Sequence, residues 1–341
     1  MRDLLPTLAT AAARDERVAI ALVAKVYRSA PRQAGSAMAL FADGRILGSV
    51  TGGCVEPDVL ANAREVLDGG PARLIPYGIA DEDAFAVGLP CGGQVDILVE
   101  PMEGDIVRVL ASDVAEERPA AYATVVAGPG LGTRRAVHPG DDPADPLVAA
   151  ALPMLAAGDT GTVQAGEDTV LVHALVPRPA MYVFGAIDHA SAVASIGKFL
   201  GYRVTVVDAR DAFLTPERFP DADELIAEWP HRFLEAAPVD RRTVICVLTH
   251  DQKFDVPALR VALSTDAGYI GAMGSRRTTE RRHQRLLEEG LTEAELARVH
   301  APIGLSIGSK TPEEVAVAVA AEIVRTFRVG PVTRDEARAQ V

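Results

Sequence analysis

Two of the three cysteines stand beside glycine pairs, a setting in which a thiol can do chemistry. Cys54 follows Gly52 and Gly53 in the stretch SVTGGCVEPD, and Glu56 comes two residues later. A glycine pair lets the backbone turn with positive φ or approach a ligand closely. A thiolate in such a turn would act as a nucleophile or as a metal ligand. The alternative, a small cysteine that only packs in a tight turn, stays open here.

The second cysteine, Cys91, lies in GLPCGGQVD and precedes Gly92 and Gly93. The third, Cys246, sits inside the apolar run VICVL, which predicts a core position. Three cysteines in 341 residues do not make a disulfide framework, so we expect reduced thiols in a cytoplasmic protein. No zinc-type spacing of His and Cys and no G-x-S-x-G motif is present, which leaves zinc and hydrolase functions without support.

A turn in the second half is similar to the G-x-G-x-x-G/A turn of dinucleotide-binding domains. It follows an apolar run and reads Gly185-Ala186-Ile187-Asp188-His189-Ala190. The first glycine and the last small residue match, but Ile187 replaces the middle glycine. We expect this β-branched residue to resist positive φ and to fill the space of a phosphate. Asp208 ends the next predicted strand, where an acid would bind the ribose hydroxyls of NAD.

Two further segments follow predicted strands of the second half, and ligands of open α/β sheets bind beyond the carboxyl ends of strands. The first, THDQKFD, places His250 and Asp251 at such an end; a purely structural hydrogen-bonding role for this pair stays open. The second, GAMGSRR, enters a predicted helix. Its glycine and its arginines suit an oxyanion or a phosphate, and its candidate residues are Gly274, Ser275, Arg276 and Arg277.

These residues need elements to position them, and the two halves of the chain predict different folds. Residues 1–177 read as an α+β domain, with a hairpin at Asp43-Gly44 and a helix after Cys54. The prolines of residues 176–180 predict a linker. Residues 178–341 alternate apolar strands with helices, which predicts a Rossmann-like, doubly wound parallel sheet. The expected fold class is therefore α/β.

The bulk composition excludes several classes of function. Hydrophobic residues make up 48% of the chain, as in a globular protein. The net charge of −13 argues against nucleic-acid binding, which needs a basic face. No apolar run is long enough for a membrane span, and the N-terminus lacks the apolar core of a signal peptide. We expect a cytoplasmic protein with neither nucleic-acid nor membrane partners.

Taken together, these motifs resemble the XdhC/CoxI family, the accessory proteins of xanthine dehydrogenase and related molybdenum hydroxylases. Three groups of segments carry the resemblance, which covers nearly the whole chain. The first is GSVTGGCVE with GLPCGG; the second is VFGAIDHASAVASIGKFLGYRVTVVDAR; the third is LTHDQKFDVPAL, YIGAMGSRR and PIGLSIGSKTPEEVAVAVAAEI. Ile187 departs from the family pattern, which has glycine at this place.

The resemblance implies a protein that binds the molybdenum cofactor (molybdopterin), protects it during sulfuration and inserts it into a hydroxylase of the xanthine dehydrogenase type. The sulfur would come from a separate cysteine desulfurase. Molybdenum favours soft thiolate ligands, so Cys54 is the first candidate for a molybdenum or sulfur contact and Cys91 the second. We expect backbone amides exposed by the flanking glycines to stabilise the thiolate, and we expect Gln33, Gly52, Gly53 and Glu56 to shape the pocket around Cys54. The pterin phosphate would lie against Arg276 and Arg277.

Two other functions remain open at this point. The first is an oxidoreductase that binds NAD(P) through the Rossmann-like half; Asp208 favours it and Ile187 weighs against it. The second is a protein that only scaffolds a hydroxylase complex. The expected assembly is a homodimer, and a chaperone that performs no turnover is preferred over an enzyme.

Overall fold

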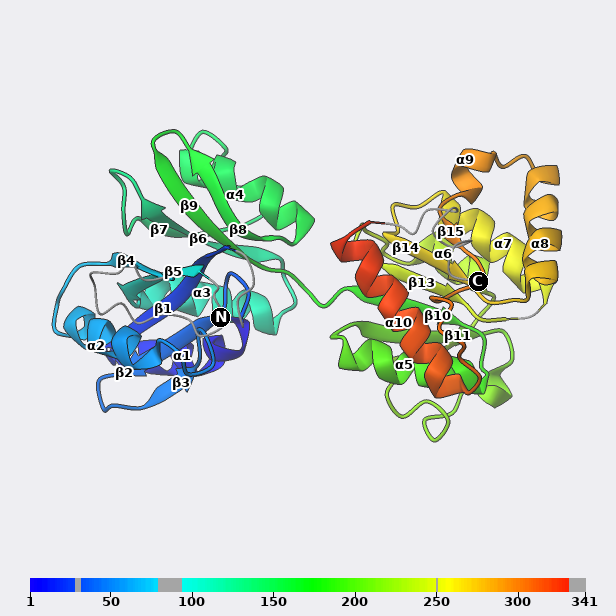
Figure 1. The fold of residues 1–341 in the computed structure, drawn as a ribbon, viewed down its shortest axis with the longest axis horizontal. Coiled ribbons are helices and arrows are strands. Elements are labelled where there is room, and N and C mark those ends of the chain that lie inside the picture. The colour runs from blue at the N-terminus through cyan, green and yellow to red at the C-terminus, as the bar shows by residue number, and fades with distance from the viewer. Residues whose placement is uncertain (28–31, 79–93, 250, 331–341) are drawn as a thin grey trace. The chain divides into compact units, whose positions relative to one another are not determined.

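The computed structural model describes residues 1–27, 32–78, 94–249 and 251–330. The chain divides into two compact units, Met1–Pro177 and Arg178–Val341 (Figure 1). Each unit has its own hydrophobic clusters, so each is described by itself. In the described ranges, no helix combines the length and the apolar character needed to cross a bilayer.

The first unit contains two antiparallel sheets. The first sheet has the strand order β3-β2-β1-β5-β4 and the second has the order β7-β6-β9-β8. The strands are β1 (Val18–Tyr27), β2 (Ala37–Phe41), β3 (Ile46–Gly48), β4 (Arg73–Tyr77), β5 (Gln94–Pro101), β6 (Ala120–Ala127), β7 (Arg134–Val137), β8 (Thr160–Ala165) and β9 (Asp168–Leu175). The helices are η1 (Arg2–Leu4), α1 (Leu5–Ala12), α2 (Glu56–Leu67), α3 (Gly104–Ala115) and α4 (Pro146–Ala157).

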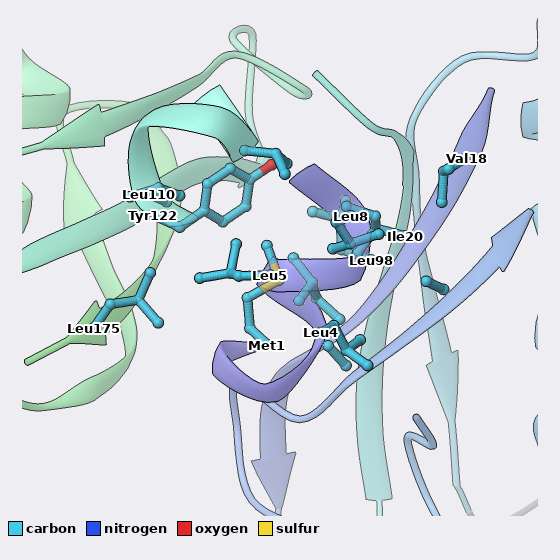
Figure 2. Close-up of a cluster of buried hydrophobic side chains, with 14 of the residues drawn as sticks. Met1, Leu4, Leu5, Leu8, Val18, Ile20, Leu98, Leu110, Tyr122 and Leu175 are labelled. Atoms are coloured by element: carbon cyan, nitrogen blue, oxygen red, sulfur yellow. The ribbon is translucent and has the colours of Figure 1, made fainter. Parts of the chain in front are cut away.

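Both faces of the first sheet are covered. Helix α2 presents Val59, Ala63 and Val66, spaced one helical turn apart, to one face of the sheet. The opposite face packs against α1, α3 and the second sheet. Figure 2 shows Leu5 and Leu8 of α1 among side chains from these elements. Helix α4 covers the outer face of the second sheet. The sheet therefore separates the α2 side of the unit from the α1 side.

The second unit is built on one parallel sheet with the strand order β12-β11-β10-β13-β14-β15. Its strands are β10 (Ala180–Phe184), β11 (Arg203–Asp208), β12 (Glu224–Ala227), β13 (Val244–Val247), β14 (Tyr269–Ala272) and β15 (Val299–His300). The first strand, β10, lies between β11 and β13, so the strand order reverses there. The predicted Rossmann-like parallel sheet and the α/β class are confirmed.

Helices cover both faces of this sheet. They are α5 (Asp188–Phe199), η2 (Asp211–Phe213), α6 (Pro230–Ala236), α7 (Gln252–Leu263), α8 (Arg276–Glu288), α9 (Glu293–Leu296) and α10 (Pro312–Arg328). Apolar side chains of α5 and α10 pack on one face, and those of α6, α7 and α8 pack on the other. The inner strands β10, β11, β13 and β14 are buried on both sides, which explains their continuous apolar sequences.

Candidate functional site

The loop before α2 is folded around the side chain of Glu56. The two carboxylate oxygens accept hydrogen bonds from hydroxyl groups and from successive backbone amides. The donors are Ser49 Oγ (2.7 Å), Thr51 Oγ1 (2.6 Å), Val50 N (3.2 Å), Thr51 N (2.9 Å), Gly52 N (2.9 Å), Gly53 N (2.8 Å) and Val55 N (3.3 Å). Partial burial raises the pKa of this carboxyl, but the hydrogen bonds outweigh it and hold the pKa far below its usual range. Glu56 is therefore the charged centre of its own loop.

The two glycines of this loop are required for their backbone conformation. Gly52 has φ +90° and Gly53 has φ +123°, values that other residues rarely adopt. A Cβ at either position would meet no heavy atom within 4 Å, so space is not the constraint. These conformations turn both amides toward Glu56. The expectation that they stabilise a Cys54 thiolate is therefore wrong, because the carboxylate uses them.

Cys54 is a free, half-buried cysteine at the end of this loop. Its side chain packs against the apolar cluster between α2 and the first sheet, and part of it reaches the surface. Cys246 is fully buried in β13, as predicted, and burial raises the pKa of its thiol. Of the two cysteines within the described ranges, Cys54 is the one that a reagent or a ligand can reach.

Of the other predicted site residues of the first half, Gln33 is the one within the described ranges. Gln33 is exposed in the turn between β1 and β2, where its carbonyl accepts the amide of Ser36 at 3.1 Å. Within the described part of the chain, no hydrogen bond joins Gln33 to the Cys54 loop. Three predicted site residues of the first half, Cys91, Gly92 and Gly93, lie outside the described residues. His250 of the second half also lies outside them.

The turn after β10 has the backbone of a Rossmann turn at its first position. Gly185 has φ +111°, and a Cβ there would lie 3.0 Å from the Thr249 methyl group, so only glycine fits. Ile187 has an extended backbone with φ −124°, and its side chain packs on the core. Ile187 therefore avoids positive φ, as expected of a β-branched residue. Ala186 donates its amide to Asp208 Oδ2 at 2.7 Å.

Asp208 ends β11 as predicted, but its carboxylate already has partners. Oδ1 accepts from the Arg210 amide and from its Nε, both at 2.9 Å, and Oδ2 accepts from Arg210 Nη2 at 2.7 Å. The side chain is 3% exposed. Burial raises the pKa of Asp208, and the bonds to Arg210 and Ala186 more than reverse this. A ribose could reach the carboxylate only by displacing Arg210.

A buried ion pair joins the ends of β13 and β14. Arg282 of α8 donates from Nη1 to Asp255 Oδ2 at 3.0 Å and to the Met273 carbonyl at 2.9 Å. Thr249 donates its hydroxyl to the other oxygen of Asp255. Both charged side chains are at most 2% exposed. Sequence reasoning missed the pair, because Arg282 stands in a run of arginines and nothing marks it as the buried one.

The remaining predicted residues of the second unit are helix caps and surface groups. Asp251 caps α7 by accepting the amide of Lys253 and pairs with its ammonium group at 3.0 Å. Ser275 caps α8 by accepting the amide of Thr278, after Gly274 with φ +152°. Arg276 and Arg277 are exposed in the first turn of α8. In the described ranges, no group of three or more His, Cys, Asp or Glu side chains is arranged to hold a metal.

Comparisons with known proteins agree with the two-unit organisation. The XdhC and CoxI family model matches residues 11–78, and the XdhC Rossmann domain model matches residues 181–323. A probable xanthine dehydrogenase subunit from Bacillus subtilis (strain 168) is 28% identical over 335 residues, covering 91% of this chain and 93% of that protein. The molybdenum cofactor insertion chaperone PaoD of Escherichia coli (strain K12) is 25% identical over 299 residues, covering 88% and 80%.

A solved structure shows the same fold. The crystal structure of a xanthine dehydrogenase from Bacillus halodurans has a TM-score of 0.69 and 23% sequence identity, and the match covers 96% of this chain and 95% of that chain. The sequence segments, the antiparallel first unit, the parallel second unit and the two family models agree. This chain belongs to the XdhC/CoxI family.

Proposed function

We propose that this protein binds the molybdenum cofactor and inserts it into a hydroxylase of the xanthine dehydrogenase type. The names of the relatives from B. subtilis and E. coli support this function. The observation that carries it for this chain is the reachable Cys54 thiol at the end of a loop that Glu56 holds in one conformation. Here the cofactor is cargo, bound for transfer and then released.

The Cys54 loop suits a soft metal or its sulfur ligand. A thiolate is the side-chain ligand that molybdenum–sulfur chemistry favours. Because the backbone of the loop is already bonded to Glu56, binding requires little reordering of the protein around the thiol. We propose Cys54 as the contact to the metal end of the cargo, with Cys91 as a second thiol. Glu56, Gly52 and Gly53 shape the loop.

The finer steps belong to the same proposal. The protein would protect the cofactor while a terminal sulfido ligand is installed, and a separate cysteine desulfurase would supply the sulfur. The assembly would be a homodimer. An NAD(P)-linked oxidoreductase is the alternative, and the occupied carboxylate of Asp208 weighs against its simplest form, in which that carboxylate binds ribose.

The test measures metal retention. Apo-protein is incubated with purified molybdenum cofactor and desalted, and molybdenum is determined by elemental analysis. Wild type is compared with Cys54→Ala and with Cys246→Ala, a control that removes a buried thiol. We expect about one molybdenum per chain in wild type and in Cys246→Ala, with loss in Cys54→Ala. No retention in wild type would refute the chaperone function, and full retention in Cys54→Ala would refute the role of this thiol.

A further inference from the structure

Two arginines share one exposed aromatic ring at the carboxyl end of β11. The guanidinium carbon of Arg210 lies 4.9 Å from the centre of the Phe213 ring, and that of Arg218 lies 5.7 Å from it. Phe213 is 45% exposed. We call these three residues the arginine–phenylalanine cluster. Guanidinium groups stack favourably on aromatic faces, which orients their N–H donors at the ring edges.

Arg210 has hydrogen-bond donors to spare. Its Nε and one Nη2 hydrogen bond Asp208, and no described residue accepts from Nη1. A guanidinium carries five N–H groups, so about three remain for a ligand. The Arg210 side chain is 49% exposed, whereas Asp208 beneath it is 3% exposed. The surface at this point therefore presents the cation and conceals the carboxylate.

Two exposed acidic side chains near the cluster have cationic partners. Asp188 pairs with Arg218 at 3.4 Å from a side chain that is almost fully exposed, which makes this contact weak. The charge of Asp251 contributes to a raised pKa of Arg210, but the Asp251 carboxylate pairs with the Lys253 ammonium group at 3.0 Å. An incoming anion would therefore compete with Asp188 for Arg218 and with Asp208 for Arg210.

The cluster lies where ligands of this fold bind. Asp208 links Arg210 to the turn after β10 through the Ala186 amide. Arg218 also lines a groove of about 480 Å³ between α5 and α10, together with Ser191, Ser195 and Ile196. The carboxyl ends of the strands are the ligand-binding edge of an open α/β sheet. A molecule held by the cluster would thus have both the turn and the groove within its reach.

The donor geometry selects a phosphate over a ribose diol. In dinucleotide-binding domains an acid at this strand end accepts from ribose hydroxyls, whereas a nearby arginine accommodates a 2′-phosphate. Here both carboxylate oxygens of Asp208 are occupied, and the remaining N–H groups of Arg210, on Nη1 and Nη2, lie in one plane and match a phosphate. We propose that the arginine–phenylalanine cluster binds the phosphomonoester group of a nucleotide, so that this unit prefers a 2′-phosphorylated dinucleotide to its unphosphorylated form. This site is additional to the proposed cargo site at Cys54.

The test is calorimetric titration of the full chain with NADP⁺, NAD⁺ and inorganic phosphate. We expect NADP⁺ to bind about tenfold tighter than NAD⁺ or more, the effect of one or two charge-assisted hydrogen bonds. Arg210→Lys keeps the charge that Asp208 needs but removes these planar N–H groups, and we expect it to abolish most of the preference. Arg218→Ala should weaken NADP⁺ binding several-fold. Arg203→Ala is the control, because Arg203 is 45% exposed and pairs with Glu224 at the other end of β11.

Three outcomes would overturn the proposal. They are equal affinity of wild type for NADP⁺ and NAD⁺, no binding of either, and an unchanged preference in Arg210→Lys of normal melting temperature. Binding of inorganic phosphate as tight as that of NADP⁺ would overturn the nucleotide assignment in favour of free phosphate. None of these results depends on molybdenum, so failure here leaves the chaperone function standing.

Discussion

The carboxylate of Glu56 lies 2.8 Å from the backbone nitrogen of Gly53, the residue immediately before Cys54. The same carboxylate accepts the amides of Val50, Thr51 and Gly52, so the whole approach to the cysteine is bonded to one side chain. Glu56 is also the first residue of α2, which packs on the first sheet. The position of the thiol therefore depends on a residue that follows it in the chain.

We predict that Glu56→Gln loosens this loop. The amide side chain replaces one acceptor oxygen by a donor that faces other donors, so we expect a loss of about 1–2 kcal/mol in the free energy of unfolding. The Cys54 thiol should then react severalfold faster with a thiol reagent. Urea denaturation and the kinetics of thiol labelling check both effects. The control is Glu65→Gln on the outer side of the same helix, where the exposed carboxylate pairs with half-buried Arg73. An equal change in that variant would contradict the prediction.

The same carboxylate predicts a pH dependence. Its pKa in the folded protein lies below the ordinary value of about 4.3. The unfolded chain therefore takes up this proton first as pH falls, and the stabilisation is complete above about pH 5 and decreases below about pH 4.5. The difference in stability between wild type and Glu56→Gln should shrink over this range. A constant difference from pH 7 to pH 3 would refute the assignment.

His173 predicts a second, separate pH effect in the first unit. Burial, with smaller effects of the N-terminal amine and Arg2, lowers its pKa to about 3. Between pH 6.5 and about 3 the unfolded chain binds a proton that the folded chain does not, so stability falls as pH falls, by up to about 1.4 kcal/mol per pH unit. His173→Gln should flatten the dependence of urea midpoint on pH in this window. His189→Gln in the second unit should leave it unchanged.

The buried Asp255–Arg282 pair predicts a large mutational effect in the second unit. Arg282→Met removes the guanidinium that pairs with the buried Asp255 carboxylate, which costs about 3–5 kcal/mol. The double variant Asp255→Leu/Arg282→Met removes both charges and should recover most of this loss. Arg281→Met, an exposed neighbour, is the control. If the double variant were as unstable as the sum of the singles, the ion pair would not explain the effect.

Gly185 and Gly201, which flank α5, are required for different reasons: both for their positive φ, and Gly185 also for lack of space. Both have positive φ, +111° and +88°, but a Cβ at Gly185 would press on Thr249 whereas one at Gly201 would meet nothing within 4 Å. We expect Gly201→Ala to lower the free energy of unfolding by about 1 kcal/mol and Gly185→Ala to lower it by about 2–3 kcal/mol. The larger loss in Gly185→Ala would come from the contact with Thr249. Thermal melts of the two variants measure this. Equal losses would show that the contact does not matter.

Local signals in the sequence predicted much of the fold. The hairpin predicted at Asp43-Gly44 is confirmed, because this pair joins β2 to β3. The signal depends on residues that are close in the chain. The apolar strands of the second unit were recognisable because a sheet covered on both faces needs continuous apolar sequence.

Side-chain partnerships were beyond the reach of the sequence. The partners Asp255 and Arg282 are 27 residues apart and meet only after α7 and α8 have packed. The pattern GGCVE showed that Glu56 was near Cys54, but the direction of its side chain depends on the positive φ of two glycines. The same holds for Asp208, whose position was predicted and whose partner Arg210 was not.

The closed hydrogen-bonding of the loop around Glu56 has a consequence for selectivity in a cell. Free phosphate, sulfate and organic acids are abundant, and a row of unpaired amides beside a thiol would attract them. Here the anion is part of the chain, and an intramolecular carboxylate is present at an effective concentration that dissolved anions do not match. The four amides from Val50 to Gly53 are thereby unavailable to small anions. If Cys54 contacts the cofactor as proposed, recognition at this point would rest on the affinity of its sulfur for a soft atom and not on charge.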